Sequence, residues 1–236
     1  MNYLLTAIDQ HFDLGFGSVA NSFKHAADSV LSSQSESPSL NAHLPASFLY
    51  RHSIELFLKS GIIIFHRKFK IPFDQEPSDS EPKVVVGLKW KPMYSVHGVQ
   101  DLYFYFRSLV FRHAEYLAEH TRTNWEFPPE LDRWISEIEA TDSTSTFFRY
   151  PVTKHKAQDA NKSIHHESNV DRVLSQLEMG ANPVKAFFVL GEGDEIVKTF
   201  TFNDELAKAM TNVLKDTANL FYGCHAAMRG ELTGGW

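Results

Sequence analysis

A helical repeat of mostly apolar side chains between about Val99 and Thr121 limits the folds that this chain can adopt. Its members recur at alternating spacings of four and three residues: Leu102, Phe106, Leu109, His113 and Tyr116. Such a spacing returns each side chain to the same face of an α-helix. The segment therefore predicts a long helix with one face in a core.

Further helical segments make a mainly α-helical fold the expectation. The first covers about Tyr3 to Leu31 and gives way to a serine-rich run that ends in proline. A second runs from about Leu44 to Arg67, with a proline in its first turn, where the missing N–H has no helical partner to lose. A short helix follows over 130–140. The last begins after Asn203, which can cap it, and ends near Gly223 or Gly230.

The remaining segments are predicted to be loops and short strands. Residues 74–92 form an acidic, proline-punctuated insertion that ends in a short strand over 84–90. A polar insertion at about 152–169 is expected to be an exposed loop, in which His165-His166-Glu167 is solvated rather than metal-binding. Two apolar runs around a glycine turn predict a β-hairpin at about 184–202. We expect one helical domain over 1–236 that carries these insertions.

Composition limits the functions open to the chain. The net charge is −6, so no global positive field attracts a polyanion, and any contact with RNA must be local. The single cysteine, Cys224, excludes an intramolecular disulfide and a thiolate metal cluster, which fits a reducing cytosol. The sequence begins without a basic leader and has no apolar run long enough for a bilayer. We therefore expect a cytoplasmic protein with no membrane partner.

A polar stripe on the second predicted helix is the first candidate site. His52, Glu55 and Lys59 fall on one helical face. They could surround an acid–base histidine, or Glu55 and Lys59 could form an ordinary ion pair beside a hydrogen-bonded histidine. His97 and Asp101, four residues apart, could pair a carboxylate with an imidazole or cap the next helix. The sequence has no tight metal-ligand motif, and we expect neither a metal nor a cofactor.

Three groups of residues together resemble bacterial HEPN-type helical proteins. They are the run Leu49–Lys59, His97 with Leu102, and Asp142 followed by Phe148-Arg149-Tyr150-Pro151. The resemblance covers roughly residues 44–151. It implies a helical bundle, frequent homodimers, and association with toxin–antitoxin or antiviral defence systems. Many members of the family are metal-independent ribonucleases.

The family's activity implies an arginine and a histidine a few residues apart. Histidine handles protons around the ribose 2′-hydroxyl, and arginine stabilises phosphate charge. Arg107 with His113 has this spacing, but in a regular helix the two side chains would point about 120° apart. His113 also lies on the apolar face, so a core histidine is the other interpretation. Ser108, which follows Arg107, departs from the family's usual form.

The second pair, Arg149 and His155, lies in the predicted loop. Lysines 154, 156 and 162 supply local positive charge there, and Tyr150 offers a surface on which a base could stack. Alternatively, Arg149 joins helices through a carboxylate such as Asp142 or Glu55. Tyr150, which follows Arg149, also departs from the family's usual form.

Two functions therefore stay open. The first is an endoribonuclease effector that uses one Arg/His pair, with RNA held by Tyr150, Lys154 and Lys156. Its supporting polar layer comprises six residues: His52, Glu55, Lys59, His97, Asp101 and Asp142. The second is a catalytically inactive module that recognises a protein or nucleotide partner. The expected partners are RNA, an antitoxin or another defence component, and a second copy of the chain.

Overall fold

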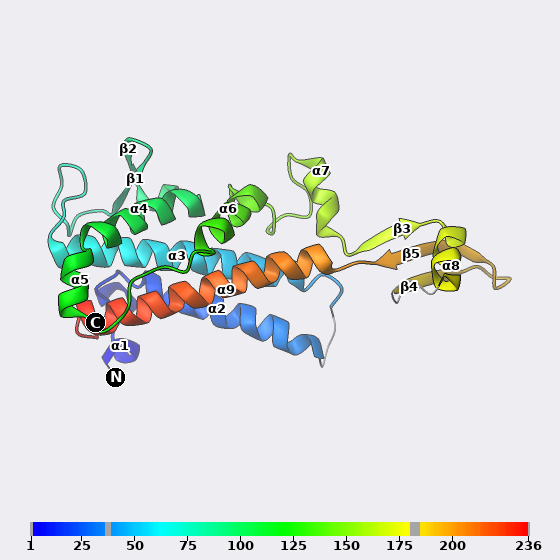
Figure 1. Cartoon of the computed structure of the whole chain (residues 1–236), viewed down its shortest axis with the longest axis horizontal. Coiled ribbons are helices and arrows are strands. Elements are labelled where there is room, and N and C mark those ends of the chain that lie inside the picture. Colours follow the sequence, from blue (N-terminus) through cyan, green and yellow to red (C-terminus); the bar gives the residue numbers. More distant parts are fainter. Residues whose placement is uncertain (1, 36–38, 180–184, 236) are drawn as a thin grey trace.

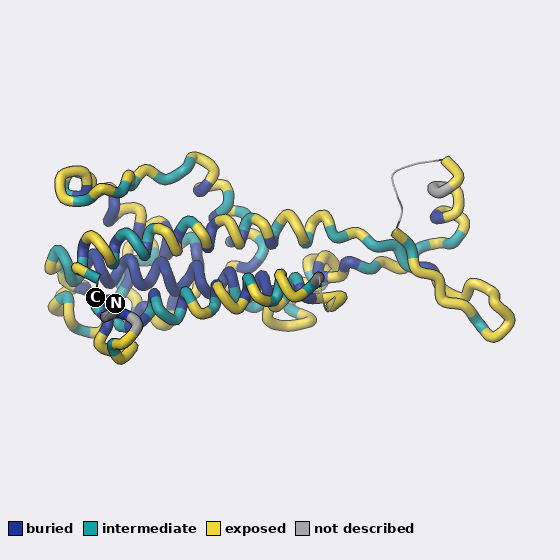
Figure 2. The backbone as a smooth tube through the Cα atoms, turned by 90° about the horizontal axis from the view of Figure 1, so that it is seen from below, coloured by how far each residue is buried: buried dark blue, intermediate teal, exposed yellow. Residues whose placement is uncertain are grey.

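The helix α3 (His43–Phe69) forms the axis of a helical bundle. Its residues are buried on every face from about Tyr50 to His66, which is typical of a helix surrounded by others. The computed structural model describes residues 2–35, 39–179 and 185–235. Figure 2 shows the buried residues concentrated along this central helix. The mainly α-helical fold is therefore confirmed.

Helices α2 (Phe16–Ser32), α4 (Val99–Arg112) and α9 (Glu205–Ala227) pack directly against α3 (Figure 1). Helix α6 (Leu131–Asp142) lies against α4 and α9. The shorter helical elements are α1 (Asn2–Leu5), α5 (Ala114–His120), α7 (Lys156–Asp159), α8 (Val170–Glu178), the 3-10 turns 8–10, 33–35, 93–95 and 160–162, and a π-helical turn at 228–232. In the described part of the chain, no helix combines the length and apolarity that crossing a membrane requires.

The prediction of a single N-terminal helix over Tyr3–Leu31 is wrong, because the helical conformation is interrupted before Phe16. Asp13 accepts hydrogen bonds from the backbone N–H groups of Gly15 (3.0 Å) and Gly17 (2.7 Å). Gly15 has a φ of 81°, a left-handed conformation that suits glycine. A carboxylate that binds the first free N–H groups starts a new helix, and α2 begins here.

The helix predicted over Val99–Thr121 is also interrupted, at His113. This residue has a φ of −108° and separates α4 from α5. The apolar face nevertheless lies in the core as predicted, since Leu102, Phe106 and Leu109 are buried.

Two small antiparallel sheets accompany the bundle. The strand predicted over 84–90 is instead a hairpin, β1 (Lys83–Val86) with β2 (Lys89–Pro92), which turns at Gly87. The predicted hairpin near the C-terminal helix is confirmed as β4 (Ala186–Leu190) with β5 (Ile196–Phe202). The loop expected over 152–169 is wrong in part, because β3 (His165–Ser168) pairs with the other edge of β5. This second sheet stands beyond the first turn of α9, at one end of the molecule (Figure 1).

Candidate functional site

Glu55 is the centre of a buried ionic cluster on α3. Its Oε1 atom accepts hydrogen bonds from Lys59 Nζ at 2.7 Å and from His97 Nδ1 at 3.0 Å. Its Oε2 atom accepts one from Arg51 Nη1 at 3.2 Å. The fold thus brings together three members of the predicted polar layer, Glu55, Lys59 and His97, around one carboxylate.

Arg51 extends this cluster to α6. Its Nε atom donates to the backbone carbonyl of Asp142 at 3.0 Å and lies 3.3 Å from that residue's carboxylate. Its Nη2 atom donates to the carbonyl of His97 at 2.8 Å. Arg51, rather than Arg149, therefore makes the bridge to Glu55 and Asp142. The four-residue step from Arg51 to Glu55 is the sequence signal that could have identified it.

The charges in this cluster keep Glu55 ionised. Burial alone would raise the pKa of Glu55, but the charge and hydrogen bond of Lys59, the hydrogen bond of His97 and the charge of Arg51 hold it below its usual range. The side chain of His97 is 53% exposed, so its imidazole has one nitrogen on a buried carboxylate and an edge in solvent. A carboxylate in that position orients an imidazole for proton transfer.

The other two predicted members of the layer lie elsewhere. The His52 ring packs between Phe23, at 4.5 Å between centroids, and Phe48, at 5.9 Å. Burial is the main reason that the pKa of His52 is lowered. Asp101 is exposed in the first turn of α4, whereas the Nδ1 atom of His97 binds Glu55. His52 thus packs against two aromatic rings, and His97 binds Glu55 in place of the expected Asp101.

Arg107 and His113 are directed to different neighbours. Arg107 Nη1 donates to both carboxylate oxygens of Asp132 on α6, at 2.6 and 2.7 Å. The His113 ring lies flat on Phe69 of α3, with 3.9 Å between centroids. Burial, and then the charge of Arg112, lower the pKa of His113. The fold supports the interpretation of His113 as a packed histidine and engages Arg107 in an ion pair.

Arg149 and His155 are both exposed on the segment between α6 and α7. The Arg149 guanidinium lies over the rings of Phe48, at 5.3 Å, and Tyr150, at 5.9 Å. The backbone N–H of His155 donates to the hydroxyl of Thr153 at 3.1 Å, just before α7 begins. Within the described residues, neither side chain forms an ion pair, so both are available to a ligand.

The buried side chain of Lys162 stabilises the segment that carries Arg149 and His155. Its Nζ atom donates to the carbonyl of Tyr150 at 2.9 Å and to Asp159 at 2.6 Å, and it lies 4.5 Å from the centre of the Phe147 ring. Lys162 is only 5% exposed, so its expected role as exposed positive charge is wrong. Lys154, Lys156 and Tyr150 are exposed as expected.

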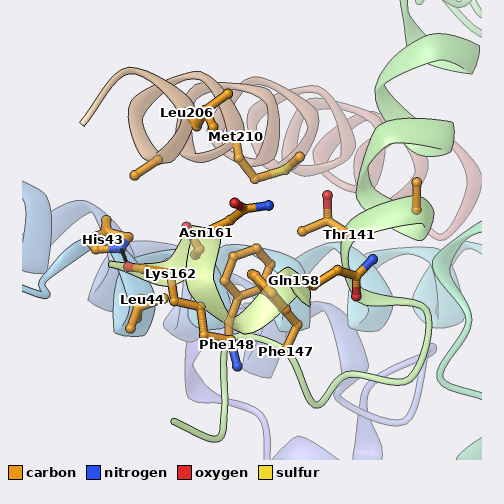
Figure 3. A pocket seen from close by; sticks show the side chains of 13 residues that line it. His43, Leu44, Thr141, Phe147, Phe148, Gln158, Asn161, Lys162, Leu206 and Met210 are labelled. Carbon is orange, nitrogen blue, oxygen red and sulfur yellow. Dashed lines mark hydrogen bonds between the residues drawn. The ribbon is translucent and has the colours of Figure 1, made fainter. Parts of the chain in front are cut away.

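Two adjoining cavities lie behind this segment, and neither is predicted by the sequence patterns. A cavity of about 250 Å³ that is partly open to solvent, called the inner cavity because it borders the central helix α3, is lined by the first turns of α3 and α9, the end of α6 and the 147–162 segment (Figure 3). An outer cavity of about 200 Å³ lies beside it, and His155 is part of its lining. Gln158 and Phe147 line both cavities, which identifies them as neighbouring compartments of one site.

Comparison with known proteins gives no identification: protein-family models, curated proteins and solved structures were searched, and none matches this chain. Among the residues described by the structure, no three His, Cys, Asp or Glu side chains are grouped so as to hold a metal ion. The assignment of function therefore depends on the geometry of the chain itself.

Proposed function

We propose that this chain is an HEPN-like protein of a bacterial defence or toxin system that acts on RNA through its surface at residues 149–156. The observation that carries the proposal is the set of exposed side chains on this one segment: Arg149, Tyr150, Lys154, His155 and Lys156. Cations bind the phosphates of an RNA strand, and a tyrosine ring stacks on its bases.

Local electrostatics favour this surface in spite of the net charge of −6. The two carboxylates that flank this segment in the sequence, Asp142 and Asp159, are occupied by internal partners. Asp142 accepts the N–H groups of Thr146 and Phe147 at 2.7 and 3.0 Å, and Asp159 binds Lys162. Because these negative charges are compensated inside the fold, the exposed cations are left to attract phosphate.

The proposed reaction is an intramolecular transesterification that cleaves the RNA backbone. His155 removes the proton from a ribose 2′-hydroxyl, whose oxygen then bonds to the adjacent phosphorus. The bond from phosphorus to the 5′-oxygen breaks, that oxygen takes a proton from solvent water, and His155 returns its proton to the solvent. The products are a 2′,3′-cyclic phosphate and a 5′-hydroxyl end, and Arg149 stabilises the charge that develops on the phosphoryl oxygens. This chemistry needs no added nucleophile.

The accessible pair is preferred to the helical pair on geometric grounds. Arg107 is already neutralised by Asp132, and His113 is stacked on Phe69. A phosphate at Arg107 would have to displace a carboxylate that is held by two contacts. At Arg149 it would replace only solvent and the faces of aromatic rings.

The test is cleavage of labelled total RNA by the purified protein in EDTA. The wild type and the Arg107→Ala and His113→Ala variants are expected to cleave, whereas Arg149→Ala and His155→Ala are expected to be inactive while retaining their circular dichroism. Loss of cleavage in His113→Ala alone would assign catalysis to the pair Arg107 and His113. Intact RNA with every protein, together with RNA binding that depends on Arg149, would refute cleavage.

A second candidate function is a catalytically inactive module that binds RNA or a protein partner. It is favoured by the position of the Arg149 guanidinium, which lies over Phe48 and Tyr150. An arginine stacked in this way is suited to holding a strand rather than to reaching a phosphate in cleavage geometry. The same RNA assay separates the candidates, because the module would bind without cutting. Light scattering on the purified protein tests whether it forms the homodimer that the HEPN resemblance implies.

A further inference from the structure

Aromatic and aliphatic side chains lie on opposite sides of the inner cavity. On one side lie Phe147 and Phe148, whose rings meet edge to face with 5.0 Å between centroids. On the other side lie Leu206 and Met210 from the first turns of α9, and Asn161 lies between the two sides (Figure 3). The volume of about 250 Å³ is below the roughly 300–1,000 Å³ of sites for drug-sized ligands. A single aromatic ring system would fill it.

The polar groups of the cavity carry no free charge. Lys162 is neutralised by Asp159, at 2.6 Å. The Nε2 atom of His43 lies 2.9 Å from the carbonyl of Lys162, which requires a proton on that nitrogen, and burial lowers the pKa of His43. The groups left for a ligand are the amides of Asn161 and Gln158, which have no hydrogen-bond partner in the described part of the chain.

Uncharged amides select among the nucleobases. Asparagine and glutamine pair with the N6 and N7 positions of adenine, since one amide supplies both an acceptor and a donor. Guanine is typically read by arginine or lysine, and cytosine by a carboxylate. Lys162, the only lysine among the described residues of the lining, is already engaged, so of the two purines the cavity suits adenine.

The outer cavity adjoins the inner cavity and includes His155 of the surface to which we assign RNA binding. Hydroxyl groups of Ser143, Thr144, Thr146 and Thr153 line it together with His155. Hydroxyl groups can donate to and accept from a ribose or phosphate. A base in the inner cavity would thus have its sugar beside the histidine to which we assign the proton transfer.

We propose that the inner cavity receives one unstacked adenine base of a single-stranded RNA. This inference rests on the proposed function, since it names the base that precedes or follows the phosphate held at the 149–156 surface. Single-stranded RNA is commonly recognised in this way, through bases splayed out onto aromatic side chains and read along their edges.

The experiment compares the binding of labelled oligoadenylate and oligouridylate of equal length, measured by fluorescence anisotropy. The wild type is expected to bind oligoadenylate about tenfold more tightly. Asn161→Leu removes an amide and Ala207→Phe fills the cavity, and both should abolish this preference while binding to oligouridylate persists. Asn219→Leu and Ala209→Phe make the same changes at exposed positions of α9 and should retain the preference.

The outcomes separate this inference from the proposed function. RNA binding without a preference for adenine, or a preference that survives both cavity variants, would overturn the adenine site and leave the RNA surface intact. If no RNA binds, adenosine monophosphate is titrated by calorimetry. Binding that Ala207→Phe removes and Ala209→Phe retains would support the cavity and refute the RNA surface. No binding of either ligand would refute both.

Discussion

Replacing Arg51 with methionine should destabilise the fold strongly, because two buried carboxylates would lose the cation that they share. The side chains of Arg51, Glu55 and Asp142 are 0%, 2% and 1% exposed. Removing one partner of a buried ion pair costs about 3–5 kcal/mol. In a protein of this size each kcal/mol lowers Tm by about 2–4 °C, so the expected decrease is roughly 6–20 °C.

The matched control is the same substitution at Arg107. The ion pair of Arg107 with Asp132 is half exposed, at 49% and 54%, and pairs of this kind contribute about 0–1 kcal/mol. Urea unfolding followed by circular dichroism gives both free energies. Losses of equal size in the two variants would refute the argument that burial of the Arg51 cluster controls stability.

A second substitution keeps the test informative if Arg51→Met does not fold. Asp142→Asn removes the charge opposite Arg51 but retains a side-chain oxygen for the N–H groups of Thr146 and Phe147. It should lose stability without losing the turn. An Asp142→Asn variant as stable as the wild type would show that the Arg51–Asp142 contact contributes little.

Three further predictions concern the packing around α2 and α9. Burial would raise the pKa of Asp13, but the contact with His225 and the hydrogen bonds from Ser60 and the Gly17 N–H lower it from 3.8 to about 2. The ionised Asp13 therefore stabilises the fold by about 2 kcal/mol above pH 3.8, and this contribution is lost as the pH falls through about 2. The difference in free energy of unfolding between wild type and Asp13→Asn, measured in urea, should shrink over that range. A constant difference would contradict the prediction. Gly17→Ala should lower Tm because a methyl group would overlap the His225 ring, whereas Gly223→Ala, in open space on a helix, should stabilise by about 0.5–1 kcal/mol; shifts of one sign would refute this. Burial raises the pKa of Cys224 from 9.0 to about 12, so its thiolate fraction at mildly alkaline pH should be about a thousandfold lower in native than in unfolded protein; equal rates of iodoacetamide labelling in buffer and in urea would contradict this.

The parts of the fold that were predicted from the sequence depend on local patterns. The helix from Leu44 and the repeat between Val99 and Thr121 are visible because apolar side chains recur at helical spacing over several turns. The hairpin of β4 and β5 is visible because a glycine turn separates two apolar runs. The third strand, β3, is polar and forms only because β5 has a second edge to pair, and that edge belongs to residues more than thirty positions later.

The candidate site was less predictable because its key contacts join distant residues. Arg51 meets Asp142 across 91 positions, and Lys162 is buried because it binds the carbonyl of Tyr150 and the carboxylate of Asp159. Charged residues are expected at the surface unless a partner is known. The sequence could therefore suggest the Glu55–Lys59 pair within one helix, but not the burial of Lys162 or the inner cavity that it lines.

The junction between β5 and α9 gives the molecule a mechanical property. Only residues 203 and 204 separate a seven-residue strand from a 23-residue helix, and the helix runs most of the length of the bundle (Figure 1). We expect so short a connection to transmit a movement of the sheet to the helix. A rotation of the sheet would move the first turn of α9. This turn carries Leu206, which lines one side of the inner cavity. A ligand that binds the sheet would thus raise or lower the affinity of the inner cavity for its own ligand, because α9 joins the two sites.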